Sequence, residues 1–323
     1  MAYSEQVLRR AQARLAREKA DCEAESNARI SNLYAQFPRL KEIDQAMRHS
    51  VAKAVSVAFQ KGADTTAAIA AIKEENLALQ QEREWILEAN DLDESALEPA
   101  VICPKCGGSG YVGAAMCECL QELCRQEQKK ELSSLLHGRE TFDSFHLDYY
   151  PTEVDPAWGV SPQQLMQITF QHCRRYAKEF SLKSPSLLFT GGPGLGKTYL
   201  SACIARTVAD NGFSVVYDTA GKLFSDFEAV KFGGDHTDVT NKYLACDLLI
   251  IDDLGTELTT QFTQSVLYQV INTRLMDSKP VIISTNIPPE ALSQRYSAPI
   301  VSRLLGAYQL CQFLGTDIRQ LRR

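Results

Sequence analysis

SLLFTGGPGLGKTYLSACIARTVA, residues 186–209, is the stretch that decides the fold of this chain. It places the pattern G-x-x-x-x-G-K-[ST] between an apolar run and a segment with apolar residues at helical spacing, as in a strand, a loop and a helix. Glycines let backbone N–H groups surround phosphates, Lys197 reaches the β- and γ-oxygens, and the Thr198 hydroxyl can bind Mg²⁺. An incidental glycine-rich turn is the alternative. The predicted nucleotide-binding residues are Gly191, Gly192, Pro193, Gly194, Leu195, Gly196, Lys197, Thr198 and Tyr199.

A second apolar run, further along the chain, ends in two acidic residues. Residues 248–251 read as a buried strand, and Asp252 and Asp253 follow directly. A carboxylate at this place can hold Mg²⁺ through water, and its neighbour can orient or deprotonate an attacking water. We therefore expect Asp252 and Thr198 to bind magnesium and Asp253 to act in catalysis.

Strands and helices alternate in this half of the chain. Apolar runs at 186–190, 215–217, 248–252 and 281–285 are separated by helical patterns at 199–209, 221–230 and 261–276. The alternation predicts an α/β fold, a parallel sheet flanked by helices. Ligands of such sheets bind at the carboxyl ends of the strands, so the loop, Asp252 and Asn286 should lie close together. The Asn286 amide would position a water there; a turn or helix-cap role before Pro288 is the alternative.

The composition is that of an ordinary globular chain. Its 323 residues, 45% hydrophobic and 23% charged, leave room for two domains or more. The apolar runs are far shorter than the roughly 20 residues that span a bilayer, and the N-terminus lacks an apolar signal-peptide core. We expect a cytoplasmic protein without membrane contact. The net charge of -6 argues against general duplex binding, although a local basic groove is compatible with it.

Four cysteines form a C-x₂-C pair followed by a C-x-C pair around a glycine-rich loop. Thiolates of Cys103, Cys106, Cys117 and Cys119 can surround a tetrahedral Zn²⁺. Cys124 is the alternative fourth ligand. A closed Cys₄ site leaves no position for water, so we expect this zinc to be structural. The other cysteines lie among apolar neighbours and should pack in the core: Cys22, Cys173, Cys203, Cys246 and Cys311.

Residues 1–98 carry apolar residues at helical intervals and few turn formers, which predicts three helices. In the first, the arginines and the apolar residues fall on different faces: Arg10, Arg14 and Arg17 against Leu8, Ala11 and Leu15. This basic face either binds an acidic partner or is solvated. An acidic stretch then leads into the cysteines. We therefore divide the chain into a helical region at 1–98, a zinc element at 99–130 and an ATPase domain with its entry linker at 131–323.

Several segments together resemble the DnaC/DnaI group of AAA+ bacterial helicase loaders, to which the IstB transposition ATPases are close relatives. They are GGPGLGKT (191–198), LLIIDDLGTE (248–257), VINTR (270–274), KPVIISTN (279–286), VSRL (301–304) and GTDIR (315–319). TFDSF (141–145) is similar to the Phe-x-x-Phe entry of that module, so the resemblance covers residues 140–323. It implies Walker A at Lys197 and Thr198 and Walker B at Asp252 and Asp253. It also implies Asn286 as sensor 1, Arg303 as arginine finger and Arg319 as sensor 2.

The resemblance implies an ATP-binding and ATP-hydrolysing loader that delivers a replicative helicase to single-stranded DNA. An arginine finger acts from a neighbouring subunit, so a homo-oligomer is expected in the ATP state. The zinc element resembles the N-terminal regions of some DnaI-type loaders, which makes residues 1–98 the expected helicase-contacting module. Arg174, Arg175, Lys178 and Lys183 either meet DNA phosphate or form a solvated helix face.

Two other functions compete with this interpretation. An IstB-like ATPase that assists a transposase shares most of the motifs. A small-molecule P-loop kinase shares the phosphate loop, but the Asp252–Asp253 pair, Asn286 and the C-terminal arginines fit oligomeric ATPases better. Asp253 also stands where many AAA+ ATPases carry Glu, and its shorter reach suggests slow turnover.

Overall fold

The computed structural model describes residues 3–58, 65–135, 140–233 and 237–320. The chain divides into two compact units, one that joins Met1–Gln12 to Glu118–Arg323 and one that comprises Ala13–Cys117. Helix α1 (Glu5–Gln36) contributes residues to both units, so the unit boundaries differ from the segment boundaries predicted from the sequence. The three predicted segments stay a prediction. Among the described residues, no helix is both long and apolar enough to cross a membrane.

A five-stranded sheet lies at the centre of the larger unit, and all its strands are parallel. The strands are β3 (Ser186–Thr190), β4 (Val215–Thr219), β5 (Leu248–Leu254), β6 (Val281–Thr285) and β7 (Tyr308–Gln312), in the order β4-β5-β6-β3-β7. The predicted α/β fold is confirmed. Strand β7 was missed because it is an edge strand with only Tyr308 and Cys311 buried, so it lacks a continuous apolar run.

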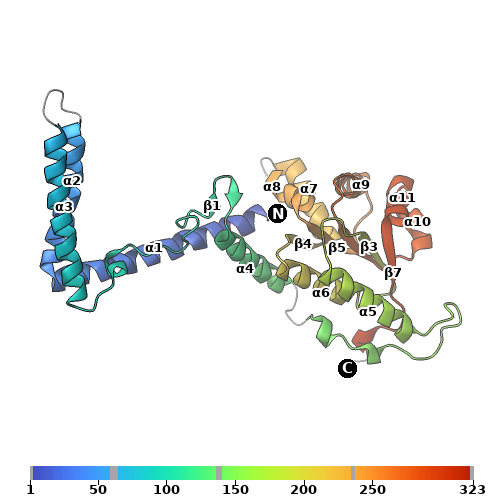
Figure 1. Cartoon of the computed structure of the whole chain (residues 1–323). Coiled ribbons are helices and arrows are strands. Elements are labelled where there is room, and N and C mark those ends of the chain that lie inside the picture. Colours follow the sequence, from blue (N-terminus) through green and yellow to red (C-terminus); the bar gives the residue numbers. More distant parts are fainter. Residues whose placement is uncertain (1–2, 59–64, 136–139, 234–236, 321–323) are drawn as a thin grey trace. The chain divides into compact units, whose positions relative to one another are not determined.

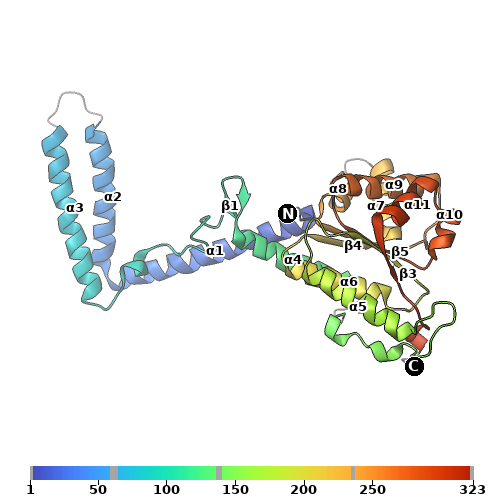
Figure 2. The same cartoon turned by 45° about the vertical axis from the view of Figure 1, so that its right-hand side comes forward.

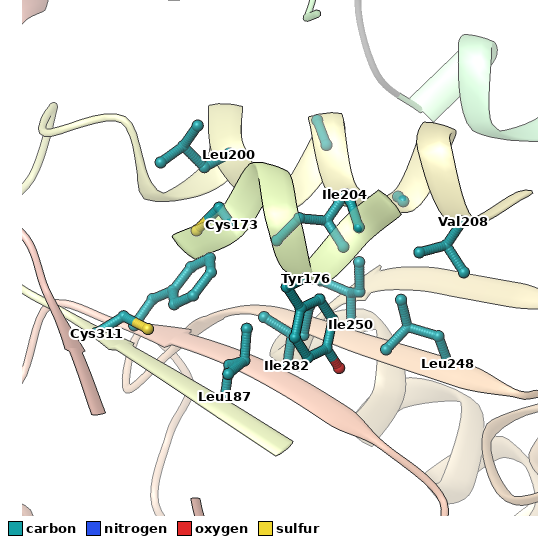
Figure 3. Packing of buried hydrophobic residues seen from close by; sticks show 14 of the residues in the cluster. Cys173, Tyr176, Leu187, Leu200, Ile204, Val208, Leu248, Ile250, Ile282 and Cys311 are labelled. Carbon is teal, nitrogen blue, oxygen red and sulfur yellow. The ribbon is translucent and has the colours of Figure 1, made fainter. Parts of the chain in front are cut away.

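Helices cover both faces of this sheet (Figure 1). Neighbouring strand residues point to opposite faces: Leu248 and Ile250 join one core, and Leu249 and Ile251 join the other. Figure 3 shows the first core, where Ile204 of one helix and Tyr176 of another lie over Ile250 and Ile282. Its helices are α4 (Glu118–Leu135), α5 (Pro162–Lys178) and α6 (Lys197–Asp210). The opposite face carries α7 (Ala220–Gly233), α8 (Thr237–Ala245), α9 (Gln261–Met276), α10 (Leu292–Arg295) and α11 (Ala298–Ala307).

Short helical turns link these elements, and the long helices α4 and α5 were not among the helical patterns predicted from the sequence. Helix α5 has a start signal in the sequence, since the Ser161 side chain caps it and Gln164 completes a capping box. The turns are η2 (Phe142–Ser144), η3 (Leu147–Tyr149), η4 (Pro289–Ala291) and η5 (Ile318–Gln320). Four cysteines are buried as predicted, Cys173, Cys203, Cys246 and Cys311, whereas Cys22 on α1 is only partly buried.

The smaller unit contains α2 (Pro38–Ala58), α3 (Thr65–Glu88) and most of α1, the helices that lie within residues 1–98. Helices α2 and α3 lie side by side and antiparallel (Figure 2). Two hydrogen bonds from Arg39 to Glu82, of 2.7 and 2.9 Å, join them, and Leu40 packs with Leu87 at their base. Beyond α3 follow η1 (Glu94–Leu97) and the hairpin of β1 (Tyr111–Val112) and β2 (Ala115–Met116).

The basic residues of α1 are accompanied by acids of the chain itself. Arg14 lies 2.8 Å from Glu18, and Arg17 lies 4.0 Å from Asp21, both one turn further along α1. Within the larger unit, Arg10 lies 2.6 Å from Glu131 of α4. These ion pairs favour a solvated face over a surface that attracts an acidic partner.

Candidate nucleotide site

The phosphate loop connects β3 to α6, as the sequence predicted. Lys197 is the first residue of α6, and its side chain turns back over the loop. Its Nζ donates to the carbonyl oxygens of Gly191 and Gly192, at 2.7 and 2.6 Å, and to Oδ1 of Asn286 at 2.7 Å. The side chain is almost fully buried, and burial lowers the pKa of Lys197 to about 8, partly offset by Asp253 and Asp252. The Lys197 ammonium group therefore connects the phosphate loop to Asn286, which follows β6.

Asp252 lies at the centre of a buried hydrogen-bond cluster. Its Oδ1 accepts from the hydroxyls of Thr198, at 3.3 Å, and Ser284. Its Oδ2 accepts from the Tyr217 hydroxyl at 2.8 Å. A carboxylate beside the Walker A threonine is the oxygen-rich donor set that Mg²⁺ prefers, so these residues fit the ion. Tyr217 and Ser284 were missed from the sequence, because nothing in their own segments shows that they face Asp252.

Asp253 adopts a left-handed backbone conformation, with φ of 54°, where the pairing of β5 with β6 is interrupted. Its N–H donates to Oγ of Ser284 at 3.0 Å, which fixes this kink. The kink lets Asp253 follow the buried Asp252 and still line the pocket. Burial and the adjacent Asp252 raise the pKa of Asp253, while Lys197 and Arg319 oppose this shift.

Most of the predicted nucleotide-site residues line one pocket of about 560 Å³; Gly191 and Gly192 do not border it. Lys197, Thr198, Asp252, Asp253, Asn286 and Arg319 all border it. Aromatic residues of the segment that enters the domain form another part of its wall, including Phe145, His146, Tyr149 and Tyr150. The Tyr150 hydroxyl donates to the carbonyl oxygen of Leu195 at 2.9 Å, so this segment supports the phosphate loop directly. Polar residues at one end and aromatic rings nearby suit a nucleoside triphosphate.

Arg303 does not line this pocket. It lies on α11, where its guanidinium donates to Oδ1 of Asn272, at 2.7 and 3.0 Å, and to the Tyr268 hydroxyl at 2.9 Å. The guanidinium also stacks 4.5 Å from the centre of the Tyr268 ring. Arg303 therefore joins α11 to α9 in its own subunit. If Arg303 acts on a nucleotide, that nucleotide is the one bound by a neighbouring subunit.

The four predicted zinc ligands come together in the glycine-rich segment. The sulfurs of Cys103, Cys106, Cys117 and Cys119 all lie within 4.8 Å of one another, and those of Cys103 and Cys117 are 3.8 Å apart. Cys124 is not part of this group; it is buried on α4, and burial raises the pKa of its thiol to about 11. The sulfur donor set fits a tetrahedral Zn²⁺ and favours Cys119 over Cys124 as the fourth ligand.

Comparison with known proteins agrees with this geometry. Residues 176–305 match the family described as IstB-like ATP binding protein. These residues are thus similar to an IstB-like ATP-binding domain. The IstB-like domain begins near the end of α5, runs through α11, and contains the phosphate loop, the Asp252–Asp253 pair, Asn286 and Arg303.

Several similar proteins are named replicative helicase loaders. The replicative helicase loader DnaC of Escherichia coli (strain K12) is 26% identical over 133 residues, which are 41% of this chain and 54% of that protein. DnaC of Buchnera aphidicola subsp. Acyrthosiphon pisum is 24% identical over 171 residues, 51% of this chain and 65% of that protein. A crystal structure of the DnaC helicase loader has 20% identity and a TM-score of 0.46 and covers 54% of this chain and 97% of that one.

These relatives confirm the resemblance to the DnaC/DnaI group. The match covers about half the length of the E. coli relative. The domain is therefore an AAA+ type of P-loop fold. The helical and cysteine-bearing segments before it lie outside the family match.

Proposed function

We propose that this chain is a cytoplasmic, ATP-hydrolysing helicase loader that delivers a replicative helicase to single-stranded DNA. The observation that carries the proposal is the meeting of Lys197, Asp252, Asp253, Asn286 and Arg319 around one pocket, in a domain whose relatives are named helicase loaders. A phosphate loop alone would fit many P-loop proteins. The acidic pair, the amide and the arginine together fit hydrolysis in an AAA+ assembly, and they argue against transfer to a metabolite.

The residues divide the chemistry among themselves. Backbone N–H groups of the loop and the Lys197 ammonium bind the phosphates, so Nζ would exchange its carbonyl partners for phosphate oxygens. Thr198 and Asp252 would hold Mg²⁺, which neutralises charge on the phosphates when bound. Asp253 and Asn286 orient the attacking water, and the raised pKa of Asp253 makes it a better proton acceptor than an exposed aspartate. Arg319 is the cation placed to stabilise charge on the γ-phosphate.

Assembly and partner binding are assigned to the parts outside this pocket. Arg303 would complete the nucleotide site of a neighbouring subunit in an ATP-dependent homo-oligomer. Residues 1–98 would contact the helicase, and the cysteine cluster would hold structural zinc between the C-x₂-C and C-x-C pairs.

For single-stranded DNA we propose the exposed face of α5. Gln164, Gln167, Gln171, Arg174 and Lys178 are exposed and follow one another at intervals of three or four residues, so they form one straight stripe. Within residues 161–184, Glu179 is the one acidic residue of the sequence, against Arg174, Arg175, Lys178 and Lys183. This local excess of positive charge on an acidic protein suits a phosphate backbone, and glutamines add hydrogen bonds to phosphate and sugar.

Co-elution with the replicative helicase of the same organism on a sizing column tests the proposal. Wild type and Lys197→Ala are compared with and without Mg·ATP. A stable complex whose amount or size changes with ATP in the wild type, but not in Lys197→Ala, is the expected result. Absence of a complex in every nucleotide state would refute the loader function.

A transposase-assisting ATPase is the second candidate, because the matched family is named for IstB. The same protein samples distinguish it. Tight binding and bending of duplex DNA, together with no affinity for helicase, would support this alternative.

A further inference from the structure

The chain that follows β7 returns to the phosphate loop and is hydrogen-bonded to it. The Phe313 N–H donates to the carbonyl oxygen of Thr190 at 2.8 Å, and the Ile318 N–H donates to that of Gly194 at 3.1 Å. One bond is made at the end of β3 and the other within the loop itself. Residues 313–318 therefore lie against the outer edge of the loop that surrounds the phosphates.

Two glycines of the loop make this close approach possible. A β-carbon at Gly194, where φ is +72°, would lie 1.7 Å from Oδ1 of Asp317. At Gly191, a β-carbon would lie 2.3 Å from the carbonyl oxygen of Phe313. At Gly191 the obstacle is backbone, so no side chain fits there, whereas at Gly194 the obstacle is the end of the Asp317 side chain. Glycine is therefore required at Gly191 to admit the C-terminal segment, and the left-handed backbone at Gly194 favours glycine while the absence of a side chain lets Asp317 approach.

Asp317 also organises the turn that carries Arg319. Its Oδ1 accepts from the Arg319 N–H at 3.0 Å, and its carbonyl oxygen accepts from the Gln320 N–H at 3.2 Å. The Ile318 N–H is therefore bound by the Gly194 carbonyl, and the next N–H, that of Arg319, is bound by the Asp317 carboxylate. The Arg319 side chain then lines the nucleotide pocket, where it faces the charges of Lys197 and Asp253.

We propose that Asp317 is a positioning residue that couples Arg319 to the phosphate loop. Its carboxylate packs against Gly194 and accepts the Arg319 N–H. A change in the conformation of the loop therefore moves Asp317 and, with it, Arg319. Arg319 thus reaches the γ-phosphate only while residues 191–194 hold the form that fits Asp317. This inference rests on the proposed nucleotide function of the same pocket.

A double-mutant cycle with Asp317→Ala, Arg319→Ala and the double variant tests the coupling. Two quantities are measured for each: the affinity for a non-hydrolysable ATP analogue and the rate of ATP hydrolysis. Asp317→Ala should lower kcat about fivefold, the factor expected for loss of a capping hydrogen bond. In the Arg319→Ala background, the same substitution should have no further effect. Asp317→Asn should retain most activity, because an amide oxygen still accepts the Arg319 N–H.

Asp93→Ala is the matched control. Asp93 caps η1 in the smaller unit in the same way, with Oδ1 accepting from the Ser95 N–H at 2.8 Å, and its loss should leave both quantities unchanged. Losses that multiply in the double variant, or an unchanged Asp317→Ala, would overturn the coupling. If the wild type binds nucleotide but does not hydrolyse it, the hydrolytic function fails while the affinity cycle still decides on Asp317. A wild type that binds no nucleotide would overturn both.

Discussion

The hydroxyl of Tyr217 on β4 donates a 2.8 Å hydrogen bond to Oδ2 of Asp252 on the neighbouring strand β5. Both groups are buried, and Asp252 is only 3% exposed. The charge of a buried carboxylate is stabilised by the groups that donate hydrogen bonds to it. Tyr217 therefore belongs to the nucleotide site, although it lies outside the family motifs.

Replacement of Tyr217 by phenylalanine removes this donor. We expect the free energy of unfolding to fall by about 1–2 kcal/mol and the affinity for Mg·ATP to change about fivefold, both from one lost bond to a buried charge. Denaturant unfolding and titration with a fluorescent nucleotide measure the two effects. Tyr176→Phe is the control, because that hydroxyl donates to the Pro185 carbonyl at 2.9 Å, just before β3 and away from Asp252. Equal nucleotide affinities in both variants would contradict the assignment.

The affinity for ATP should depend on pH through Lys197. Burial lowers the pKa of its ammonium to about 8 in the free protein, and phosphate binding needs the charged form. The affinity should therefore fall as the pH rises above about 8, and binding in that range should take up a proton. Between about 8 and 10.5 the unfolded chain holds this proton more firmly than the folded one, so the same group adds stability as the pH rises.

Nucleotide titrations between about pH 7 and 9.5 check this prediction. The control is Lys197→Arg, whose guanidinium stays charged throughout. Its affinity, though lower, should not follow the same pH dependence. A wild-type profile that matches that of the arginine variant would be inconsistent with titration of Lys197.

Zinc content should depend on Cys119 and not on Cys124. We expect about one Zn²⁺ per chain by elemental analysis, as for a single Cys₄ site. Cys119→Ser should lose the metal and lower the melting temperature, because the segment has too few apolar residues to form a core of its own. Cys124→Ser, which removes a buried thiol nearby in sequence, should keep its zinc. The opposite pattern would make Cys124 the ligand.

The exposed basic residues of α5 should contribute phosphate contacts. Replacement of Arg174, Arg175 and Lys178 by alanine should weaken single-stranded DNA binding and reduce the slope of log affinity against log salt by about 2, roughly 0.7 for each contact. A variant with Arg9, Arg17 and Lys19 replaced by alanine loses the same charge elsewhere and serves as control. Equal slopes in the two variants would mean that α5 is a solvated face.

Arg303 should act in trans. Arg303→Ala and Lys197→Ala should each lower ATP turnover by about 10³-fold or more. Mixing the two variants should restore part of it, because an intact phosphate loop of one subunit can then meet an intact Arg303 of another. Melting temperatures are measured in parallel, since Arg303 also binds Asn272 and Tyr268 in its own subunit. Failure of the mixture to recover any turnover would leave Arg303 with its structural role alone.

Local patterns identified the residues that act through their own segment. The phosphate loop needs its glycines and Lys197 in a fixed order, and the part of β5 that precedes Asp252 is apolar because it is buried on both faces. The cysteine spacing placed four sulfurs within reach of one ion, and the structure brings the same four together. The start of helix α5 is also marked locally, by the capping box of Ser161 and Gln164, although a helix near Arg174 was predicted only as an alternative.

The amino-acid sequence by itself determined that a phosphate loop, an acidic strand end and a polar strand end occur in the order of a parallel α/β fold. Each of these three features can be recognised from the sequence because it depends on residues only a few positions apart. Only the tertiary structure decided that Tyr217 and Ser284 bind Asp252, that Asp317 rests on Gly194, and that Arg303 stacks on Tyr268. These contacts join residues far apart in the chain, and their existence depends on strand order and helix packing, which bring the segments together.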